Sequence, residues 1–63
     1  MRQYTLKELR ARKDWTQQET AEKLGVSTQT YNSWENDFGK VKIKAASDVA
    51  RIFGVKLDQI KIS

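Results

Sequence analysis

The chain has 63 residues and a formal net charge of +4, from 12 lysines and arginines against 8 aspartates and glutamates. A chain this short buries too little surface for two cores, so we expect a single domain over residues 1–63. Cysteine and histidine are absent, which excludes disulfides, thiolate nucleophiles, imidazole bases and Cys/His zinc sites.

The composition also limits the classes of function. No stretch approaches the roughly 18 to 20 consecutive apolar residues of a membrane span, and no apolar signal-peptide segment follows the first residues. We therefore expect a soluble, cytoplasmic protein with no membrane partner. The carboxylates are scattered and no glycine-rich phosphate loop occurs, so we expect no enzyme activity, no cofactor and no metal. The positive charge favours a polyanionic partner.

Capping boxes mark the first two helices. Thr5 with Glu8, and Thr16 with Glu19, repeat the pattern in which a threonine hydroxyl accepts a backbone N–H and a glutamate reaches back. Gly25 stands where a left-handed C-cap would end the second helix. These signals predict helices over residues 6–13 and 17–24.

A third helix is predicted over residues 28–36, because Ser27 is a good N-cap. Ser27 stands only three residues after Leu24, a spacing typical of a helix-turn-helix motif, whose second helix is the one presented to DNA.

A fourth helix is predicted over residues 43–53, where apolar residues recur at three- and four-residue spacing until Gly54. The tail over residues 55–63 is interpreted as a short fifth helix, although residues 60–62 also alternate like a strand edge. The expected fold is therefore all-α, a compact bundle of five short helices.

The third predicted helix carries two different faces. At about 100° per residue, Tyr31 and Trp34 lie on one face and neutral polar side chains lie on the other. Such side chains hydrogen-bond without charge and suit base edges in the major groove of DNA. The polar face of an ordinary small bundle is the alternative. The candidate base-reading residues are Thr28, Gln29, Asn32 and Ser33.

Groups suited to phosphates flank this helix. Gln17 and Gln18 begin the second helix, where unpaired backbone amides and the positive end of the dipole favour an anion. Lys40, Lys42 and Lys44 follow the third helix at alternate positions. The alternative for the lysines is a solvated loop, and for Gln17 a first-turn residue without a partner.

Five segments occur together in a characteristic order and spacing: Leu6–Arg10, Trp15–Glu19, Ala21–Ser27, Trp34–Asn36 and Phe53–Asp58. They cover nearly the whole chain, and together they resemble the Cro/cI-type, or XRE-like, helix-turn-helix family of phage repressors and bacterial regulators. The resemblance implies a lambda-repressor-like DNA-binding domain of five packed helices.

The resemblance also implies partners and roles. The partner is double-stranded DNA, usually bound as a homodimer on a near-palindromic operator. By matching position, Gln17 and Asn36 are implied phosphate contacts, and Arg10 and Glu35 an internal salt bridge. Thr28, Gln29 and Ser33 are the implied base-reading set, with Asn32 beside them. The implied function is sequence-specific DNA binding as a transcriptional regulator, a phage or mobile-element type repressor with helix 28–36 in the major groove.

Two features depart from the family pattern. Members commonly carry glycine directly after the asparagine of the Glu-Asn pair, and a proline and a capping Ser or Thr before the fourth helix. Here Asp37 takes the glycine position, where it is expected to oppose phosphate contacts, and Lys42 stands at the helix start without a capping acceptor. No arginine lies on the reading face, which favours A·T pairs through Gln29 and Asn32.

A protein-binding helix-turn-helix module, such as an antitoxin or anti-repressor, is the alternative function. In that case the polar helix face or Phe38 would engage another protein. DNA binding driven by phosphates would instead weaken by orders of magnitude between about 50 and 200 mM salt. Apolar residues outside the clear core periodicity are candidates for a dimer surface: Phe38, Val41, Ile60 and Ile62.

Overall fold

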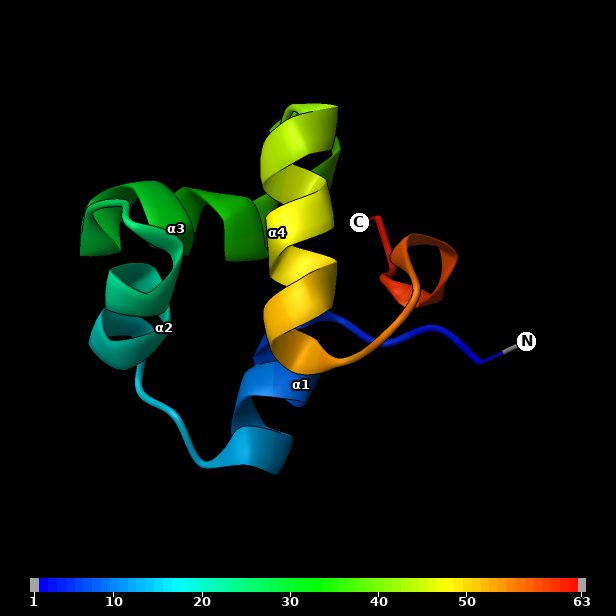
Figure 1. Cartoon of the computed structure of the whole chain (residues 1–63), viewed down its shortest axis with the longest axis horizontal. Helices are drawn as coiled ribbons and strands as arrows, with labels where there is room; N and C mark the ends of the chain where they lie inside the picture. The colour runs from blue at the N-terminus through cyan, green and yellow to red at the C-terminus, as the bar shows by residue number, and fades with distance from the viewer. Residues whose placement is uncertain (1, 63) are drawn as a thin grey trace.

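The computed structural model describes residues 2–62, and its regular structure within them is entirely helical (Figure 1). Four α-helices and two single-turn 3-10 helices follow one another along the chain. They are α1 (Leu6–Lys13), α2 (Gln17–Leu24), α3 (Thr28–Asn36), η1 (Phe38–Lys40), α4 (Ile43–Phe53) and η2 (Leu57–Gln59). None of these helices is long and apolar enough to cross a membrane.

The helix starts follow the caps expected from the sequence. The Thr5 and Thr16 side chains accept the N–H of Glu8 and Glu19, and both glutamates accept the threonine N–H in return. Ser27 caps α3 by accepting the N–H of Thr30. The predicted bounds of all four α-helices are confirmed. The starts of α1, α2 and α3 were predictable because these local hydrogen bonds depend only on neighbouring residues, whereas α4 begins at the expected residue without a side-chain cap.

Left-handed residues end three of the helices. Gly25 and Gly54 end α2 and α4 with φ of 72° and 68°, a conformation that glycine adopts without steric cost. Asp14 ends α1 with φ of 57°. Aspartate tolerates this region better than most residues because its short side chain is polar. The chain therefore turns sharply at each of these three positions.

The helices surround one core whose buried residues come from every part of the chain. Tyr31 of α3 and Val49 of α4 are completely buried, and Thr20 of α2 is also fully inaccessible. The Thr20 hydroxyl donates to the Thr16 carbonyl at 2.9 Å, so its burial leaves no unpaired donor. The buried hydrophobic residues are Leu6, Leu9, Ala21, Tyr31, Phe38, Ala46, Val49, Ala50, Phe53 and Ile60.

The short fifth helix expected in the tail is present only as a single 3-10 turn, and the strand-like alternation noted at residues 60–62 corresponds to a bridge at Ile60. The tail forms only the three-residue η2 and then runs beside the N-terminal segment, where Tyr4 and Ile60 make an isolated parallel bridge. The Tyr4 N–H donates to the Gln59 carbonyl and the Lys61 N–H donates to the Tyr4 carbonyl, each at 2.7 Å. These bonds use backbone groups that a continued helix would need, and they join the two ends of the described chain (Figure 1).

The loop expected between the third and fourth helices is also more ordered than the sequence indicated. It contains η1, where the Asp37 carboxylate accepts the Gly39 N–H at 3.1 Å. Phe38 is only 6% exposed and belongs to the core. A Cβ at Gly39 would lie 3.2 Å from both Asp37 Oδ1 and Ile62 Cγ2, so a larger residue there would require these side chains to shift by a few tenths of an ångström.

Candidate nucleic-acid interface

The outer face of α3 is polar, uncharged and open. Thr28, Gln29, Asn32 and Ser33 are all exposed, whereas Tyr31 is buried on the inner face. The side chains of Thr28 and Gln29 form no hydrogen bond with any residue between 2 and 62, so their donors and acceptors are free for a ligand. Ser33 differs, because its hydroxyl donates to the Thr30 carbonyl at 2.6 Å.

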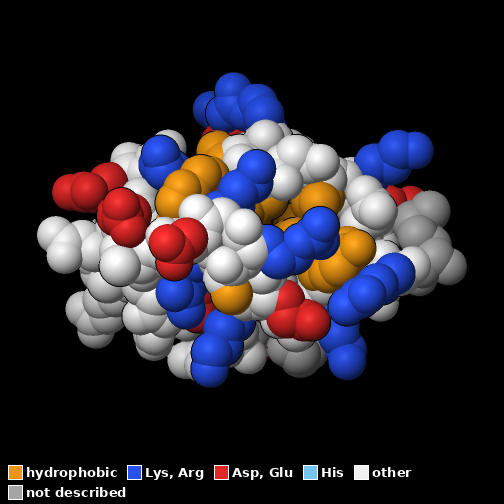
Figure 2. All heavy atoms as spheres, turned by 90° about the horizontal axis from the view of Figure 1, so that it is seen from below, with side chains coloured by type: hydrophobic (Ala, Val, Ile, Leu, Met, Phe, Trp, Pro, Cys, Tyr) orange, Lys and Arg blue, Asp and Glu red, His pale blue; other side chains and the backbone are white. Residues whose placement is uncertain are grey.

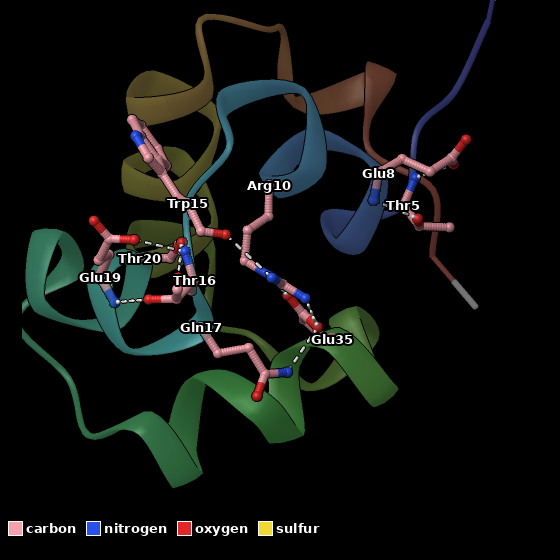
Figure 3. Close-up of polar contacts among 9 residues, drawn as sticks. All are labelled: Thr5, Glu8, Arg10, Trp15, Thr16, Gln17, Glu19, Thr20 and Glu35. Atoms are coloured by element: carbon pink, nitrogen blue, oxygen red, sulfur yellow. Dashed lines mark hydrogen bonds and ion pairs between the residues drawn. The ribbon is translucent and has the colours of Figure 1, made fainter.

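An ion pair links the last turn of α3 to α1. Arg10 Nε of α1 donates to Glu35 Oε2 at 2.7 Å, and the two side chains are only 18% and 8% exposed. Arg10 Nη1 also donates to the Trp15 carbonyl at 3.1 Å. Figure 3 shows these groups converging between α1, the chain before α2, and the last turn of α3. This is the pairing of Arg10 with Glu35 that the resemblance implied.

Gln17 belongs to the same cluster. Its Nε2 donates to Glu35 Oε1 at 2.9 Å, so the side chain points toward α3 (Figure 3). The sequence indicated a phosphate contact at Gln17 and gave no sign of this bond. The amide nitrogen carries a second hydrogen that the Glu35 contact does not use. Gln18, the other phosphate candidate at this helix start, is exposed.

The cluster fixes the charge state of Glu35. Burial raises the pKa of the Glu35 carboxyl, but the hydrogen bond and charge of Arg10, the neighbouring Tyr31 hydroxyl and the Gln17 amide together outweigh burial and hold that pKa below its ordinary value. Burial also raises the pKa of the neighbouring Tyr31 hydroxyl, and the Glu35 carboxylate raises it further. Glu35 is therefore ionised and Tyr31 protonated at neutral pH. The Tyr31 hydroxyl has no hydrogen-bond partner among residues 2–62.

Lysines and free backbone amides border the other end of α3. Lys40, Lys42 and Lys44 are all exposed. No side chain caps α4, since Lys42 stands at its N-cap, so the first amides of α4 remain available to an anion. The Asp37 carboxylate is half-buried and occupied by the Gly39 N–H. Asn36, the last residue of α3, is exposed and has a long contact of 3.5 Å to Asn32.

Positive charge by itself does not single out the α3 side. Figure 2 shows the side of the molecule that carries α1, where basic and acidic side chains are interspersed with hydrophobic ones. Two cations outside α3 lie against aromatic rings: Arg12 is 4.9 Å from the Tyr4 ring centre and Lys23 is 4.7 Å from that of Trp15. What distinguishes α3 is its neutral hydrogen-bonding face beside lysines that form no ion pair with any residue between 2 and 62.

The candidate dimer residues divide into two groups. Phe38 and Ile60 are 6% and 2% exposed, so assigning them to a dimer surface is wrong, because they are core residues. Val41 is half-buried. Ile62 is 68% exposed and Ile43, which the sequence pattern placed in the core periodicity of α4, is 71% exposed. Ile43 is the first residue of α4, so it fits the apolar spacing of this helix even though its side chain is exposed.

The part of the chain between residues 2 and 62 contains no group of three His, Cys, Asp or Glu side chains that could hold a metal ion.

Comparison with known proteins agrees with this geometry. The helix-turn-helix family model matches residues 6–60. The chain is 33% identical over 55 residues to the HTH-type transcriptional regulator AnsR of Bacillus subtilis, covering 87% of this chain but only 47% of AnsR. It is 42% identical over 57 residues to the uncharacterized HTH-type transcriptional regulator MJ0272 of Methanocaldococcus jannaschii, covering 90% of this chain and 86% of MJ0272. The chain thus spans about half the length of AnsR. No solved structure matches it significantly.

Proposed function

The chain belongs to the XRE-type helix-turn-helix family, and from that premise we propose that it is a sequence-specific DNA-binding transcriptional regulator. We propose more narrowly a repressor of the phage or mobile-element type, acting in the cytoplasm. The observation that carries the proposal is the outer face of α3, where uncharged hydrogen-bonding side chains lie exposed beside unpaired lysines. Both relatives are named as HTH-type transcriptional regulators, which supports the same activity.

In this proposal α3 enters the major groove. Gln29 and Asn32 can each pair with adenine N6 and N7, and the Thr28 methyl group can contact the methyl group of thymine. No charged side chain stands on this face, so a preference for A·T pairs is expected. Direct base contacts of this kind set specificity, while phosphate contacts set register and affinity.

The phosphate contacts lie on both sides of α3. On one side, the first amides of α2 and the free hydrogen of Gln17 Nε2 face the backbone. On the other, Lys40 and Lys42 stand beside the uncapped start of α4. The Arg10–Glu35 pair neutralises the carboxylate that α3 would otherwise bring close to phosphates.

We further propose that two copies bind a near-palindromic operator. Half-sites one helical turn apart are separated by about 34 to 36 Å, and the domain measures 30 × 24 × 18 Å. Two copies whose long axes lie along the duplex would therefore approach each other to within a few ångströms, a gap that protruding side chains can bridge. The apolar surface made by Ile43 and Ile62 is the contact proposed for the second copy, because two large exposed aliphatic side chains occur there together with half-buried Val41.

The small area available for this contact limits the stability of the dimer. A stable dimer buries about 800 Å² on each partner, which is about a fifth of the 4315 Å² surface of this domain. Only two large hydrophobic side chains, Ile43 and Ile62, are exposed within residues 2–62, far fewer than the roughly 20 to 30 residues that each side of a standard interface contributes. We therefore expect the copies to pair on DNA and to be largely monomeric when free.

Salt dependence tests the function. Fluorescence anisotropy with a labelled duplex should show affinity falling by orders of magnitude between about 50 and 200 mM salt if phosphate contacts drive binding. Binding that hardly changes with salt would favour the protein-binding alternative, an antitoxin or anti-repressor module.

A further inference from the structure

A groove opens between the α2–α3 turn and the first turns of α4. Four half-buried apolar side chains form its floor, namely Leu24, Val26, Trp34 and Ala45. Its volume is about 290 Å³, close to the lower end of the roughly 300 to 1,000 Å³ typical of small-molecule sites. A ligand with one ring or one branched aliphatic group would fill it.

The rim of the groove is positively charged. Lys42 and Lys44 line it, and both side chains are exposed. Within residues 2–62 the ion pairs are Arg10–Glu35 and Arg51–Asp48, so neither lysine has an acidic partner there. Asp48 also lines the groove, but Arg51 Nη2 lies 2.9 Å from its carboxylate and offsets its charge. The rim therefore offers two free ammonium groups to a ligand.

We propose that this groove binds a small apolar carboxylate, with the hydrocarbon part against Trp34 and the carboxylate between Lys42 and Lys44. Charge complementarity selects the anion, because a neutral ligand would gain no ion pair and a cation would be repelled. The apolar floor selects the hydrocarbon part, whose burial removes it from water. A phosphate group alone would contact the lysines and leave the floor uncovered.

A consequence for regulation rests on the proposed function. Lys42 is one of the proposed phosphate contacts and Lys44 lies beside it, so the bound carboxylate and the DNA backbone compete for the same positive charge. Each ligand must then weaken the other by the same factor, since coupling between two sites is reciprocal. Occupation of the groove is expected to release the regulator from DNA.

Binding is tested first without DNA, by titrating the full chain and recording ¹H–¹⁵N NMR spectra. The ligands used are phenylacetate, 3-phenylpropanoate and 4-methylpentanoate, each beside its uncharged amide. At least one carboxylate should shift the signals of Val26, Ala45 and the Trp34 indole N–H, and should bind at least threefold more tightly than its amide. A ligand of this size at ordinary efficiency binds with a Kd of roughly several millimolar. No shift at these signals at several times that concentration, or equal affinity for acid and amide, would overturn the proposal.

Three variants separate the floor from the rim. Ala45→Leu fills the groove with a good helix former and should abolish the shifts at Val26 and Trp34. The double variant Lys42→Gln and Lys44→Gln should remove the preference for the carboxylate over the amide, whereas Lys56→Gln, outside this groove, should retain it. Retention of full carboxylate binding in Ala45→Leu would place the ligand elsewhere and contradict the proposal. Concentration-dependent shifts without ligand would mean that a second copy covers the groove, which also contradicts it.

Competition is then measured with DNA. A binding carboxylate should raise the Kd for DNA in the unmodified chain and leave it unchanged in Ala45→Leu. If the chain binds the carboxylate but no DNA, the proposed function fails while the groove stands. If it binds DNA and the groove signals do not shift, this inference fails alone.

Discussion

Gln17 Nε2 lies 2.9 Å from Glu35 Oε1, so the first residue of α2 is hydrogen-bonded to the last turn of α3. The same carboxylate receives Arg10 from α1 at 2.7 Å. Three helices thus share one carboxylate, and the two segments proposed to hold phosphate and to read bases are fixed to each other through it. A hydrogen bond to a charged group contributes about 1.5 to 3 kcal/mol, more than one between neutral groups.

Gln17→Ala is expected to lower both stability and DNA affinity. It removes a bond to Glu35 and a proposed phosphate contact, so the loss of affinity should be equal for all duplex sequences. Gln18→Ala is the control, because Gln18 is exposed and should contribute little to the free energy of unfolding. Urea unfolding and anisotropy measure the two effects. An unchanged unfolding free energy in Gln17→Ala would mean that the bond to Glu35 does not stabilise the fold.

Arg10→Ala should lower the free energy of unfolding by at least about 1.5 kcal/mol, since it leaves the Glu35 carboxylate buried without its main partner. The chain supplies a matched comparison in Arg51–Asp48, whose side chains are 75% and 44% exposed. Arg51→Ala should cost less than about 0.5 kcal/mol, as exposed pairs do. Urea unfolding of both variants decides the point. A loss below about 0.5 kcal/mol in Arg10→Ala would show that the pair behaves like a surface contact.

Stability should fall in acid. The pKa values of Glu8, Glu19 and Glu35 all lie below the ordinary 4.5 in the folded chain, so the unfolded chain binds protons more tightly. Their stabilisation is therefore present above about pH 4.5 and is lost as the pH falls through the lowered folded-state values. Urea unfolding between pH 7 and 3 tests this. Glu19→Gln keeps a capping oxygen that does not titrate, so its stability should decline less. A stability that rose between pH 5 and 3 would contradict the sign.

Gln29→Ala and Lys40→Ala should weaken DNA binding in different ways. Gln29→Ala should cost about 1 to 3 kcal/mol on the preferred duplex and relax selection at one base pair. Lys40→Ala should weaken all duplexes similarly and reduce the salt slope by about one. Anisotropy on preferred and scrambled duplexes at several salt concentrations separates them. Equal losses on every sequence for Gln29→Ala would remove that residue from the reading face.

Ile62→Ser should reduce cooperativity on a two-half-site duplex and leave binding to one half-site unchanged. Ile62 is 68% exposed, so little core packing is lost. Band-shift titrations on the two duplexes measure the effect, with Lys23→Ser as a control far from the proposed contact. Unchanged cooperativity in Ile62→Ser would show that the copies meet through another surface.

The sequence predicted features that depend on local chemistry. Threonine and serine caps set the starts of α1, α2 and α3, and the glycines at residues 25 and 54 set the ends of α2 and α4, because their hydrogen bonds and backbone angles involve only adjacent residues. The polar face of α3 followed from helical periodicity for the same reason. The Arg10–Glu35 pair was implied by family resemblance and not by the residues alone.

Features that depend on distant contacts were not predicted. Nothing near Gln17 in the sequence indicates Glu35, which is 18 positions away. The tail was expected to be helical. Instead, the Gln59 carbonyl and the Lys61 N–H form hydrogen bonds with the backbone of Tyr4, near the other end of the chain. Phe38 was an open candidate for a partner surface, whereas tertiary packing buries it against the core. Ile43 shows the converse. It is apolar and fits the core periodicity of α4, but its side chain is 71% exposed.

Selection from a randomised duplex library at about 150 mM salt tests the central claim most directly. The account predicts enrichment of an inverted repeat rich in A·T pairs, with half-sites about one helical turn apart. Enrichment of a single half-site would retain base reading by α3 but contradict the homodimer. No enrichment by a chain shown to be folded by circular dichroism would contradict sequence-specific DNA binding itself.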